Sequence, residues 1–244
     1  MSTTSGTSVT LVRNATILAT VGGTTFLVDP LFAEQGALPP IDDTPNDRAN
    51  PLVPMPDVDL SYDAVIVTHR HPDHFDEAAK AALDPDVPLF CQPAEEAAFV
   101  DEGFTDVRPV EVRASFDGIT LHRTPGRHGH GELAERMGPV SGFVLEGETT
   151  LYLAGDTVWY GPVAETLDRF EPDAVVLNGG AARFNHGEPI TMGVADVSAV
   201  RGATDAAVAV VHMEAINHCL LSRAELRAAT DDVLVPEDGE SFEL

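Results

Sequence analysis

The sequence predicts a single α/β domain in which chemically capable side chains collect along one edge. Three observations lead to this expectation. Apolar strands are followed by helical segments, several strands end on a polar residue, and one short segment holds three histidines and an aspartate. The chain has 244 residues, 43% of them apolar, which suffices for a full core and is compatible with one domain over residues 1–244.

The N-terminal region predicts a short lead and a hairpin. Residues 1–8 are polar and small, and we expect a flexible segment there. The β-rich runs Val9–Leu18 and Thr24–Val28 are joined through two consecutive glycines, which is a hairpin signal, and the dipeptide Asp29-Pro30 ends the second strand.

Residues 33–62 predict a long acidic loop. They are rich in proline and show little hydrophobic periodicity. Loops of this length inside a compact domain are usually functional or disordered. Both a lid over a site and a solvated acidic insertion fit the sequence, which does not decide between them.

Four later strands each lead directly to a residue that can bind a metal or a substrate. They are Asp63–Thr68 before His69, Thr149–Gly155 before Asp156, Asp173–Leu177 before Asn178, and Asp205–Val211 before His212. Ligand-type residues at successive strand ends are typical of an α/β domain with one reactive edge.

Helices and shorter strands complete the prediction. Helices are expected at Asp73–Leu83, Val163–Phe170 and Thr191–Val200, and a last helix begins at the capping box Ser222-Arg223-Ala224-Glu225. Further strands are expected at Leu89–Cys91, Asp106–Val112, Ile119–Arg123 and Val140–Leu145, the last two as antiparallel neighbours.

The segment Thr68-His69-Arg70-His71-Pro72-Asp73-His74 carries the strongest chemical signal. Imidazole and carboxylate are the groups that Zn²⁺, Mn²⁺ and Fe²⁺ select. His69 and His71 can face one metal, while Asp73 and His74 face a second. Asp73 and His74 would also open the following helix, whose N-terminal dipole favours a carboxylate. The alternative is a polar turn with surface histidines.

Two further segments can supply ligands. Asp156 stands at the end of an apolar strand, where its two oxygens could bridge two cations, although capping of the next turn is also common. His128 and His130 lie among glycines that allow the backbone to approach an ion. Spacing does not choose between these two histidines, so one is expected to be a ligand and the other a pocket or surface residue.

The remaining candidates are weaker. His212 ends a strongly apolar strand, which favours it as a ligand, and His218 follows six residues later. His218 could hydrogen-bond the site or a substrate, or could be a packed histidine satisfied by the backbone. Asn178 could direct its amide at the site or simply occupy a tight turn. His122 and His186 are isolated, and no role is predicted for them.

The charge balance limits the partners. There are 40 acidic and 14 basic residues, a net charge of −26, and Lys80 is the single lysine. Such a field repels nucleic acid and anionic membranes and favours adaptation to high salt. No apolar run is long enough to span a membrane. Cys91 and Cys219 are expected to be reduced, as in a cytoplasmic protein. The oligomeric state is not indicated.

Taken together, these residues resemble the metallo-β-lactamase fold superfamily of metal-dependent hydrolases. The resemblance runs from about Val9 to Leu226. Within it, Asn14-Ala15-Thr16 and Leu27-Val28-Asp29-Pro30 resemble the start of the ascorbate-6-phosphate lactonase-like branch. The matching motifs, in the superfamily's order, are Thr68–His74, the glycine-flanked His128, Gly155-Asp156-Thr157 and His212.

The resemblance implies a four-layer αβ/βα sandwich with a dinuclear site at one edge. By position, His69, His71 and His128 would hold the first metal; Asp73, His74 and His212 would hold the second; and Asp156 would bridge them. The chain departs from some relatives in the extra His130 and in the insertion at residues 33–62.

Metal chemistry then predicts a hydrolase with two divalent ions, zinc first, with manganese or iron as alternatives. A bound metal lowers the pKa of its water to roughly 7, so metal-bound hydroxide can attack a small ester, lactone or phosphoester. Asp73 would orient the hydroxide and relay a proton. An iron-dependent redox enzyme, a nuclease and a non-catalytic metal-binding protein are the alternatives. Candidates for holding an anionic substrate group are Arg127, Arg136, Arg183 and Arg201.

Overall fold

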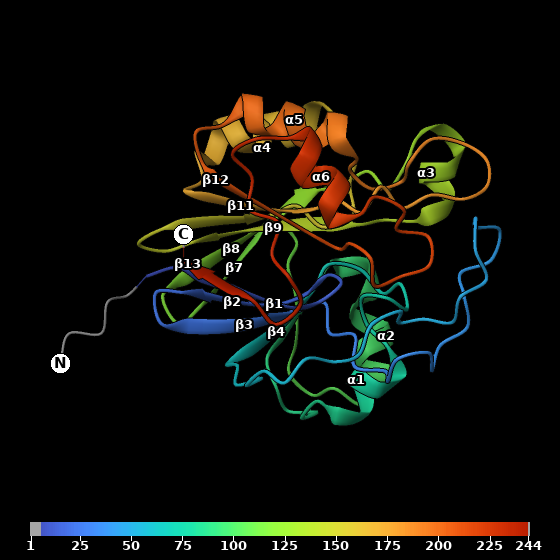
Figure 1. Cartoon of the computed structure of the whole chain (residues 1–244). Helices are drawn as coiled ribbons and strands as arrows, with labels where there is room; N and C mark the ends of the chain where they lie inside the picture. Colours follow the sequence, from blue (N-terminus) through green and yellow to red (C-terminus); the bar gives the residue numbers. More distant parts are fainter. Residues whose placement is uncertain (1–5, 244) are drawn as a thin grey trace.

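The computed structural model describes residues 6–243 and contains two β-sheets that pack face to face, with helices over both outer faces (Figure 1). This confirms the predicted four-layer αβ/βα sandwich. Residues 1–5 of the expected flexible lead lie outside the described residues. The lead does not extend to residue 8, because Thr7 is buried and Ser8 begins the first strand.

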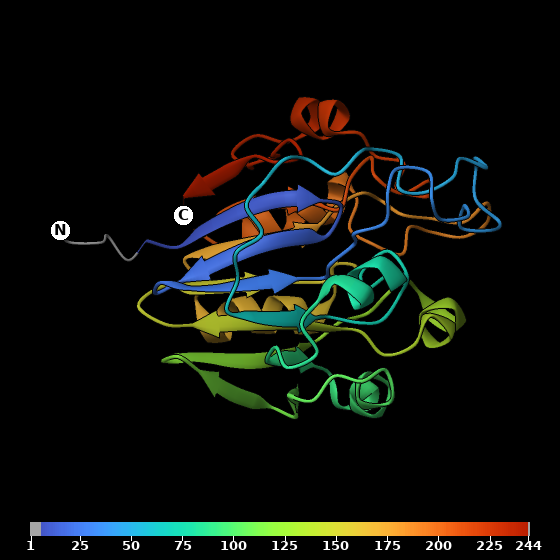
Figure 2. The ribbon, with the colours of Figure 1, turned by 90° about the horizontal axis from the view of Figure 1, so that it is seen from below.

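The first sheet is mixed and has seven strands, which lie side by side in Figure 2. The first three strands along the chain are antiparallel, and the next three are parallel to β3. In spatial order the strands are β13 (Ser241–Glu243), β1 (Ser8–Arg13), β2 (Thr16–Val21), β3 (Thr24–Val28), β4 (Ala64–Val67), β5 (Leu89–Cys91) and β6 (Val107–Pro109).

The second sheet has six strands. Strands β7 to β10 are antiparallel neighbours, and β10, β11 and β12 are parallel, so β8, β10, β11 and β12 all run in one direction. Their carboxyl ends therefore reach the same edge. In spatial order the strands are β12 (Ala207–Val211), β11 (Ala174–Asn178), β10 (Thr150–Leu153), β9 (Ser141–Glu146), β8 (Ile119–Pro125) and β7 (Arg113–Phe116).

The helices cover the two outer faces (Figure 1). The first sheet is covered by α1 (Glu77–Ala82) and α2 (Glu96–Asp101), which follows the 3₁₀ turn η1 (Pro93–Glu95). The second is covered by α4 (Gly161–Phe170), α5 (Val194–Ala203) and α6 (Arg223–Ala229), while α3 (Gly131–Met137) lies at the end of the sandwich. None of the helices in residues 6–243 has the length and apolar character needed to cross a membrane.

The main core lies between the sheets, and strand alternation explains how each sheet serves two layers. In β11, Val176 faces the core between the sheets, whereas Val175 and Leu177 face the layer of α4 and α5. Because successive side chains of a strand point to opposite faces, a strand that is buried on both sides is apolar throughout. All five residues of β11 are buried.

Several predicted boundaries were wrong for identifiable reasons. The run Val9–Leu18 is two strands, because Asn14 adopts a left-handed conformation (φ 58°) and turns the chain between β1 and β2. The strand expected over residues 106–112 is shorter, and α2, α3, β7 and β13 were not predicted. The antiparallel pairing of β8 with β9 and the capping box at Ser222 are confirmed.

Candidate metal centre

Four of the candidate ligands lie in one short loop between β4 and α1. The carbonyl of His71 accepts hydrogen bonds from the N–H groups of His74 (2.9 Å) and Phe75 (3.0 Å), which folds the loop into a tight turn. The prediction that Asp73 and His74 open the helix was wrong. The helix begins at Glu77, because the side chain of Asp76 accepts the N–H of Ala79 and acts as the N-cap.

The other three candidates come from three separate loops of the second sheet. His128, Asp156 and His212 follow β8, β10 and β12, respectively. Gly155 has φ 66°, and a Cβ atom there would lie 2.7 Å from the carbonyl oxygen of Ser141, so only glycine allows this tight approach before Asp156. His212 has φ 61°, which is costly for a residue with a side chain and is typical of functional sites.

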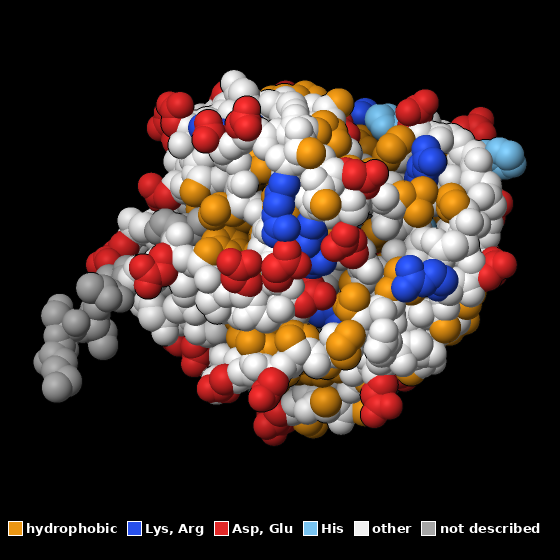
Figure 3. Space-filling model, in the orientation of Figure 1, with side chains coloured by type: hydrophobic (Ala, Val, Ile, Leu, Met, Phe, Trp, Pro, Cys, Tyr) orange, Lys and Arg blue, Asp and Glu red, His pale blue; other side chains and the backbone are white. Residues whose placement is uncertain are grey.

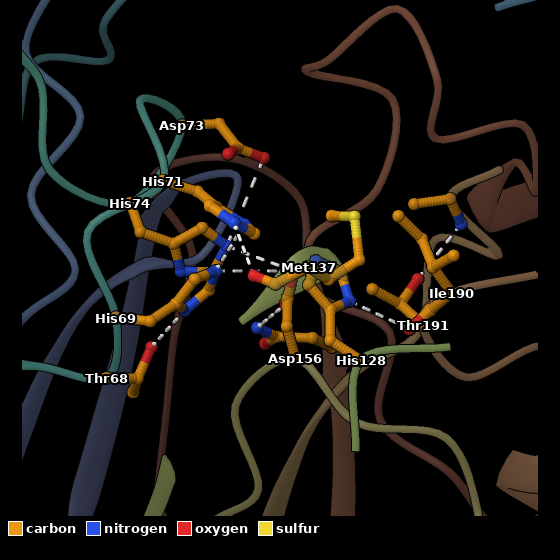
Figure 4. Close-up of polar contacts among 12 residues, drawn as sticks. Thr68, His69, His71, Asp73, His74, His128, Met137, Asp156, Ile190 and Thr191 are labelled. Atoms are coloured by element: carbon orange, nitrogen blue, oxygen red, sulfur yellow. Dashed lines mark hydrogen bonds and ion pairs between the residues drawn. The ribbon is translucent and has the colours of Figure 1, made fainter. Parts of the chain in front are cut away.

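These seven side chains converge at the shared edge of the two sheets, where Figure 4 shows six of them with labels. Within each of three groups, one ligand atom from every member lies within 4.8 Å of the others. The groups are His69, His71 and His128; Asp73, His74 and His212; and His69, His74 and Asp156.

Asp156 lies between the first two groups. Its Oδ2 is 3.4 Å from Nε2 of His128 and 3.3 Å from Nε2 of His74, and its Oδ1 is 3.7 Å from Nε2 of His212. One carboxylate therefore faces ring nitrogens from both groups. Its position is fixed by Asn178, whose amide donates a hydrogen bond of 2.7 Å to Oδ1.

The outward nitrogen of each histidine ring is held by a separate partner. The Nδ1 atom of His74 donates to Asp29 (2.8 Å), and that of His128 donates to the carbonyl of Ile190 (2.9 Å). Nδ1 of His69 lies 3.1 Å from the Thr68 hydroxyl, and Nε2 of His71 lies 3.1 Å from the Met137 carbonyl. Nδ1 of His212 lies 3.3 Å from Sγ of Cys219.

These contacts at the outward ring nitrogens explain why the cluster suits metal ions. In a neutral ring, a proton that is held on the outward nitrogen leaves the inward nitrogen with a free lone pair, and ligating histidines are commonly oriented in this way. The donor set of imidazoles and carboxylates fits divalent cations such as zinc, manganese or iron.

The charges in the cluster are strongly coupled. Burial alone would raise the pKa of Asp156, but His212 and His74 hold that pKa well below its usual range. The pKa of Asp73 is likewise lowered by His74 and His212 against the effect of burial. Both carboxylates are therefore ionised at neutral pH, as a metal ligand must be.

The histidines divide into two classes. Burial lowers the pKa values of His69 and His128, so both rings are neutral at pH 7. Burial also acts to lower the pKa of His74, but Asp156, Asp29 and Asp73 raise it to about 10. Asp156 and Cys219 similarly raise the pKa of His212 well above its ordinary value.

The structure separates the two glycine-flanked histidines. His128 is buried in the cluster, whereas His130 is exposed and stands at the N-cap of α3 without a side-chain cap. His218 is 5% exposed and lines a cavity beside the cluster, together with Asp73. Its Nδ1 atom has no hydrogen-bond partner, so the backbone does not satisfy this ring nitrogen.

Sequence reasoning missed Asp29 as a supporting residue. Its carboxylate accepts hydrogen bonds from the Thr68 N–H and hydroxyl (both 2.7 Å) and from the His74 ring. The available signal was that Asp29 directly follows β3, which is the parallel neighbour of β4. The strand-end rule that indicated His69 therefore also points to Asp29.

The loop over residues 33–62 is anchored beside the cluster. The side chain of Asn217 accepts the N–H of Ile41 and the amide of Asn50 (both 2.9 Å) and donates to Thr44 (2.7 Å). Thr44 and Asn50 are buried, and Ile41 lines the same cavity as His218. The acidic side chains Asp42 and Asp43 are exposed, so this loop combines a solvated outer edge with a fixed inner wall.

The four arginines suggested as anion ligands lie elsewhere. Arg136 and Arg183 are exposed, the guanidinium of Arg127 stacks on the ring of Tyr160 at 4.6 Å, and Arg201 donates to the carbonyls of Thr204 and Ala206. None of them lines the cavity beside the cluster.

Comparison with known families gives one match that spans most of the chain. Residues 24–213 match the family described as the beta-lactamase superfamily domain. Among curated proteins, UPF0173 protein YddR of Bacillus subtilis is 39% identical over an alignment of 251 positions, which covers 96% of this chain and 99% of that protein.

Two solved structures are similar over nearly their full lengths. A possible metal-dependent hydrolase from Veillonella parvula has a TM-score of 0.93 and 34% identity, covering 98% of this chain and 100% of that one. The isothiocyanate hydrolase from Delia radicum gut bacteria has a TM-score of 0.90 and 38% identity, covering 97% and 100%.

Proposed function

We propose that this chain, which belongs to the beta-lactamase superfamily and is a metal-dependent hydrolase, holds two divalent metal ions and hydrolyses a small molecule. The observation that carries the dinuclear assignment is the position of Asp156 between two groups of donors. His69, His71 and His128 would hold one ion, and Asp73, His74 and His212 the other.

Ions held by these residues would lower the pKa of a bound water to roughly 7 and would polarise the oxygen of the group under attack. The protein itself contributes buried side chains whose orientations are fixed by hydrogen bonds. His69, His74, Asp156 and His212 are at most 2% exposed, and their outer contacts fix the ring orientations. Such pre-organisation avoids rearrangement during the reaction.

Asp73 has a second role in this proposal. Its Oδ2 lies 3.4 Å from Nε2 of His212 and 4.0 Å from Nε2 of His74, and its carboxylate is ionised. Asp73 also lines the cavity beside the cluster. It can therefore accept a hydrogen bond from the attacking water, orient it, and pass a proton to the leaving group.

Small esters, lactones, phosphoesters and isothiocyanates form the substrate panel. The first three follow from the chemistry of the donor set. Isothiocyanates enter because a hydrolase with that substrate in its name is 38% identical over nearly the whole chain. We place zinc first among the metals, because imidazole and carboxylate donors suit it well.

The charge of the molecule supports a small-molecule substrate over a nucleic acid. Acidic side chains outnumber basic ones on the face shown in Figure 3, in line with the net charge of −26. A nuclease needs a basic surface along the phosphate backbone. We further propose a cytoplasmic protein adapted to high salt, without a membrane or nucleic-acid partner.

Removal and return of metal tests the proposal. The purified protein is analysed for bound metals, stripped with a chelator, and assayed on the panel before and after addition of Zn²⁺, Mn²⁺ or Fe²⁺. We expect about two metal equivalents and hydrolysis that disappears and returns with the metal. Oxygen uptake would support the redox alternative, and metal binding without turnover would support the non-catalytic one.

A further inference from the structure

A small cavity beside the metal cluster holds a polar group that the proposed function does not use. The cavity is about 130 Å³, and an apolar space of similar size can hold a molecule such as benzene. Segments far apart in the sequence form its walls. The lining residues are Ile41, His71, Pro72, Asp73, His128, Met137, Phe184 and His218.

The lining has a clear chemical character. His71, Asp73 and His128 of the cluster line it, and Ile41, Met137 and Phe184 contribute apolar surface. Among the described lining residues, none is an arginine or a lysine, and Asp73 is ionised. An anionic substituent placed against Ile41, Met137 and Phe184 would lose its hydration without gaining a cationic partner there, which is costly. This apolar part of the lining therefore suits an uncharged group.

His218 is a polar lining residue that belongs to none of the three ligand groups. It is 5% exposed, and its Nδ1 atom is buried without a hydrogen-bond partner. A buried polar atom without a partner costs roughly 1–3 kcal/mol, so natural proteins seldom keep one without a reason. His218 also lines the cavity, so a substrate placed there lies beside this ring.

The backbone around His218 is fixed from both sides. The Arg183 N–H donates to the His218 carbonyl (3.1 Å), and the Asn46 side chain donates to the carbonyl of Asn217 (2.6 Å). These hydrogen bonds hold the segment that carries the His218 ring, and the loop over residues 33–62 supplies one of them. Burial lowers the pKa of His218 to about 4, so the neutral ring can donate one hydrogen bond at pH 7 without carrying a charge.

We propose that His218 is a catalytic residue that donates a hydrogen bond to an uncharged substrate whose apolar group fills the cavity of Ile41, Met137 and Phe184. This inference rests on the proposed hydrolase function. When hydroxide adds to a C=N or C=O carbon, a C–O bond forms and the π pair moves onto the nitrogen or oxygen. The ring N–H of His218 stabilises that atom and keeps its own proton.

The test compares His218→Leu, which removes the donor, with His218→Asn and His218→Gln, whose amides lie near the positions of Nδ1 and Nε2. The exposed residue His186 provides the control variant His186→Leu. Assays use the metal-loaded protein with phenyl isothiocyanate and its 4-carboxy analogue. Metal content is measured for every variant.

We expect His218→Leu to lower kcat/KM by about 10–100-fold at unchanged metal content, which is the usual effect of one lost hydrogen bond to a reacting group. Asn or Gln should restore most of the loss, and the neutral substrate should be preferred at least about tenfold over the carboxylate. Full activity of the leucine variant, equal loss in all three variants, or equal use of the charged substrate would overturn the proposal.

A binding measurement separates this inference from the hydrolase proposal. Benzamide is neutral, is not an isothiocyanate, and carries a carbonyl acceptor, so its affinity can be measured by calorimetry without turnover. Weaker binding to His218→Leu than to wild type, in a protein that hydrolyses nothing on the panel, would support the role of His218 and reject the hydrolase. Equal benzamide affinity would reject the role of His218.

Discussion

The two sheets contribute to the candidate metal centre in opposite ways. The first sheet supplies His69, His71, Asp73 and His74 from one loop after β4, so these ligands are neighbours in the sequence. The second sheet supplies His128, Asp156 and His212 from three loops that span 85 positions. The first set is held together by local turns, whereas the second exists only when the sheet is assembled.

This difference indicates which substitutions should disrupt the cluster most. If one ligand of the local turn is replaced, the turn should still hold the other ligands in place, because each ligand contacts a limited set of partners. Asp156 contacts ring nitrogens from both donor groups, so its loss affects both. We therefore expect the two halves to respond differently to equivalent substitutions.

The largest effect is expected for Asp156→Ala compared with His71→Ala. Residues that only support ligands typically contribute 10–100-fold to metal affinity, and Asp156 faces both groups directly, so Asp156→Ala should weaken metal binding at least about 100-fold and leave close to no bound metal after dialysis. His71 belongs to the first group alone, so His71→Ala should lose one equivalent and retain the other. Hydrolysis should be abolished in both variants.

Elemental analysis after dialysis measures this difference, and thermal unfolding of each variant checks that the fold is intact. Equal metal loss in the two variants would show that Asp156 does not link the groups. Retained metal and full turnover in either variant would remove the ligand assignment altogether.

A smaller effect on metal affinity is expected when the residues that hold the outward histidine nitrogens are replaced. Asp29→Asn weakens the support of His74 and Thr68 in the first half, and supporting residues of this kind typically contribute 10–100-fold to metal affinity. Cys219→Ala removes the outer contact of His212 in the second half. A thiol is a weak hydrogen-bonding group, so the change should be below about tenfold.

Metal affinity, measured by competition with a chelating indicator, tests the order of these two effects. Asn178→Leu serves as a matched comparison, because Asn178 supports Asp156 from the second sheet. If Cys219→Ala were the more damaging variant, the proposed importance of Asp29 would be wrong.

The two donor groups should also differ in their pH dependence. The raised pKa of His74, about 10, means that this ring keeps its proton below that pH when no metal is bound, and a metal must displace it. Affinity at the group containing His74 and His212 should therefore rise as pH increases from 6 to 9. The lowered pKa values of His69 and His128 leave those rings neutral, so affinity there should change less.

Stepwise metal titrations at several pH values, combined with the His71→Ala variant, assign each affinity to a group. Proton release on binding gives an independent reading, since filling the second group should release more protons near pH 7. The same pH slope for both steps would contradict the division of the histidines into two classes.

The smallest effect on the cluster is expected from salt, which should act on the whole surface. With a net charge of −26, exposed carboxylates repel one another, and dense counterions screen that repulsion. The unfolding midpoint should rise between low and molar KCl, while metal content stays constant. Sucrose at matched osmolality is the control, and an unchanged midpoint in KCl would reject adaptation to high salt.

The α/β fold class and the local half of the cluster follow from the sequence alone, whereas the four-layer arrangement follows from the family resemblance. Strand periodicity and strand-end residues indicated an α/β fold with one reactive edge, and three histidines with one aspartate in six positions indicated a metal site. These signals are local, because a strand alternates over a few residues and a turn brings neighbouring side chains together.

The choice among the distant candidates depends on how the folded chain arranges them. The fold placed His128 in the cluster and His130 on the surface, although both have glycine neighbours, because the chain turns away at Gly129 and Gly131 (φ 101° and 54°). It also revealed the roles of Asp29 and Asn217, and the partnerless ring nitrogen of His218. Such contacts depend on sheet order and loop packing, which residues far apart in the chain establish only on folding.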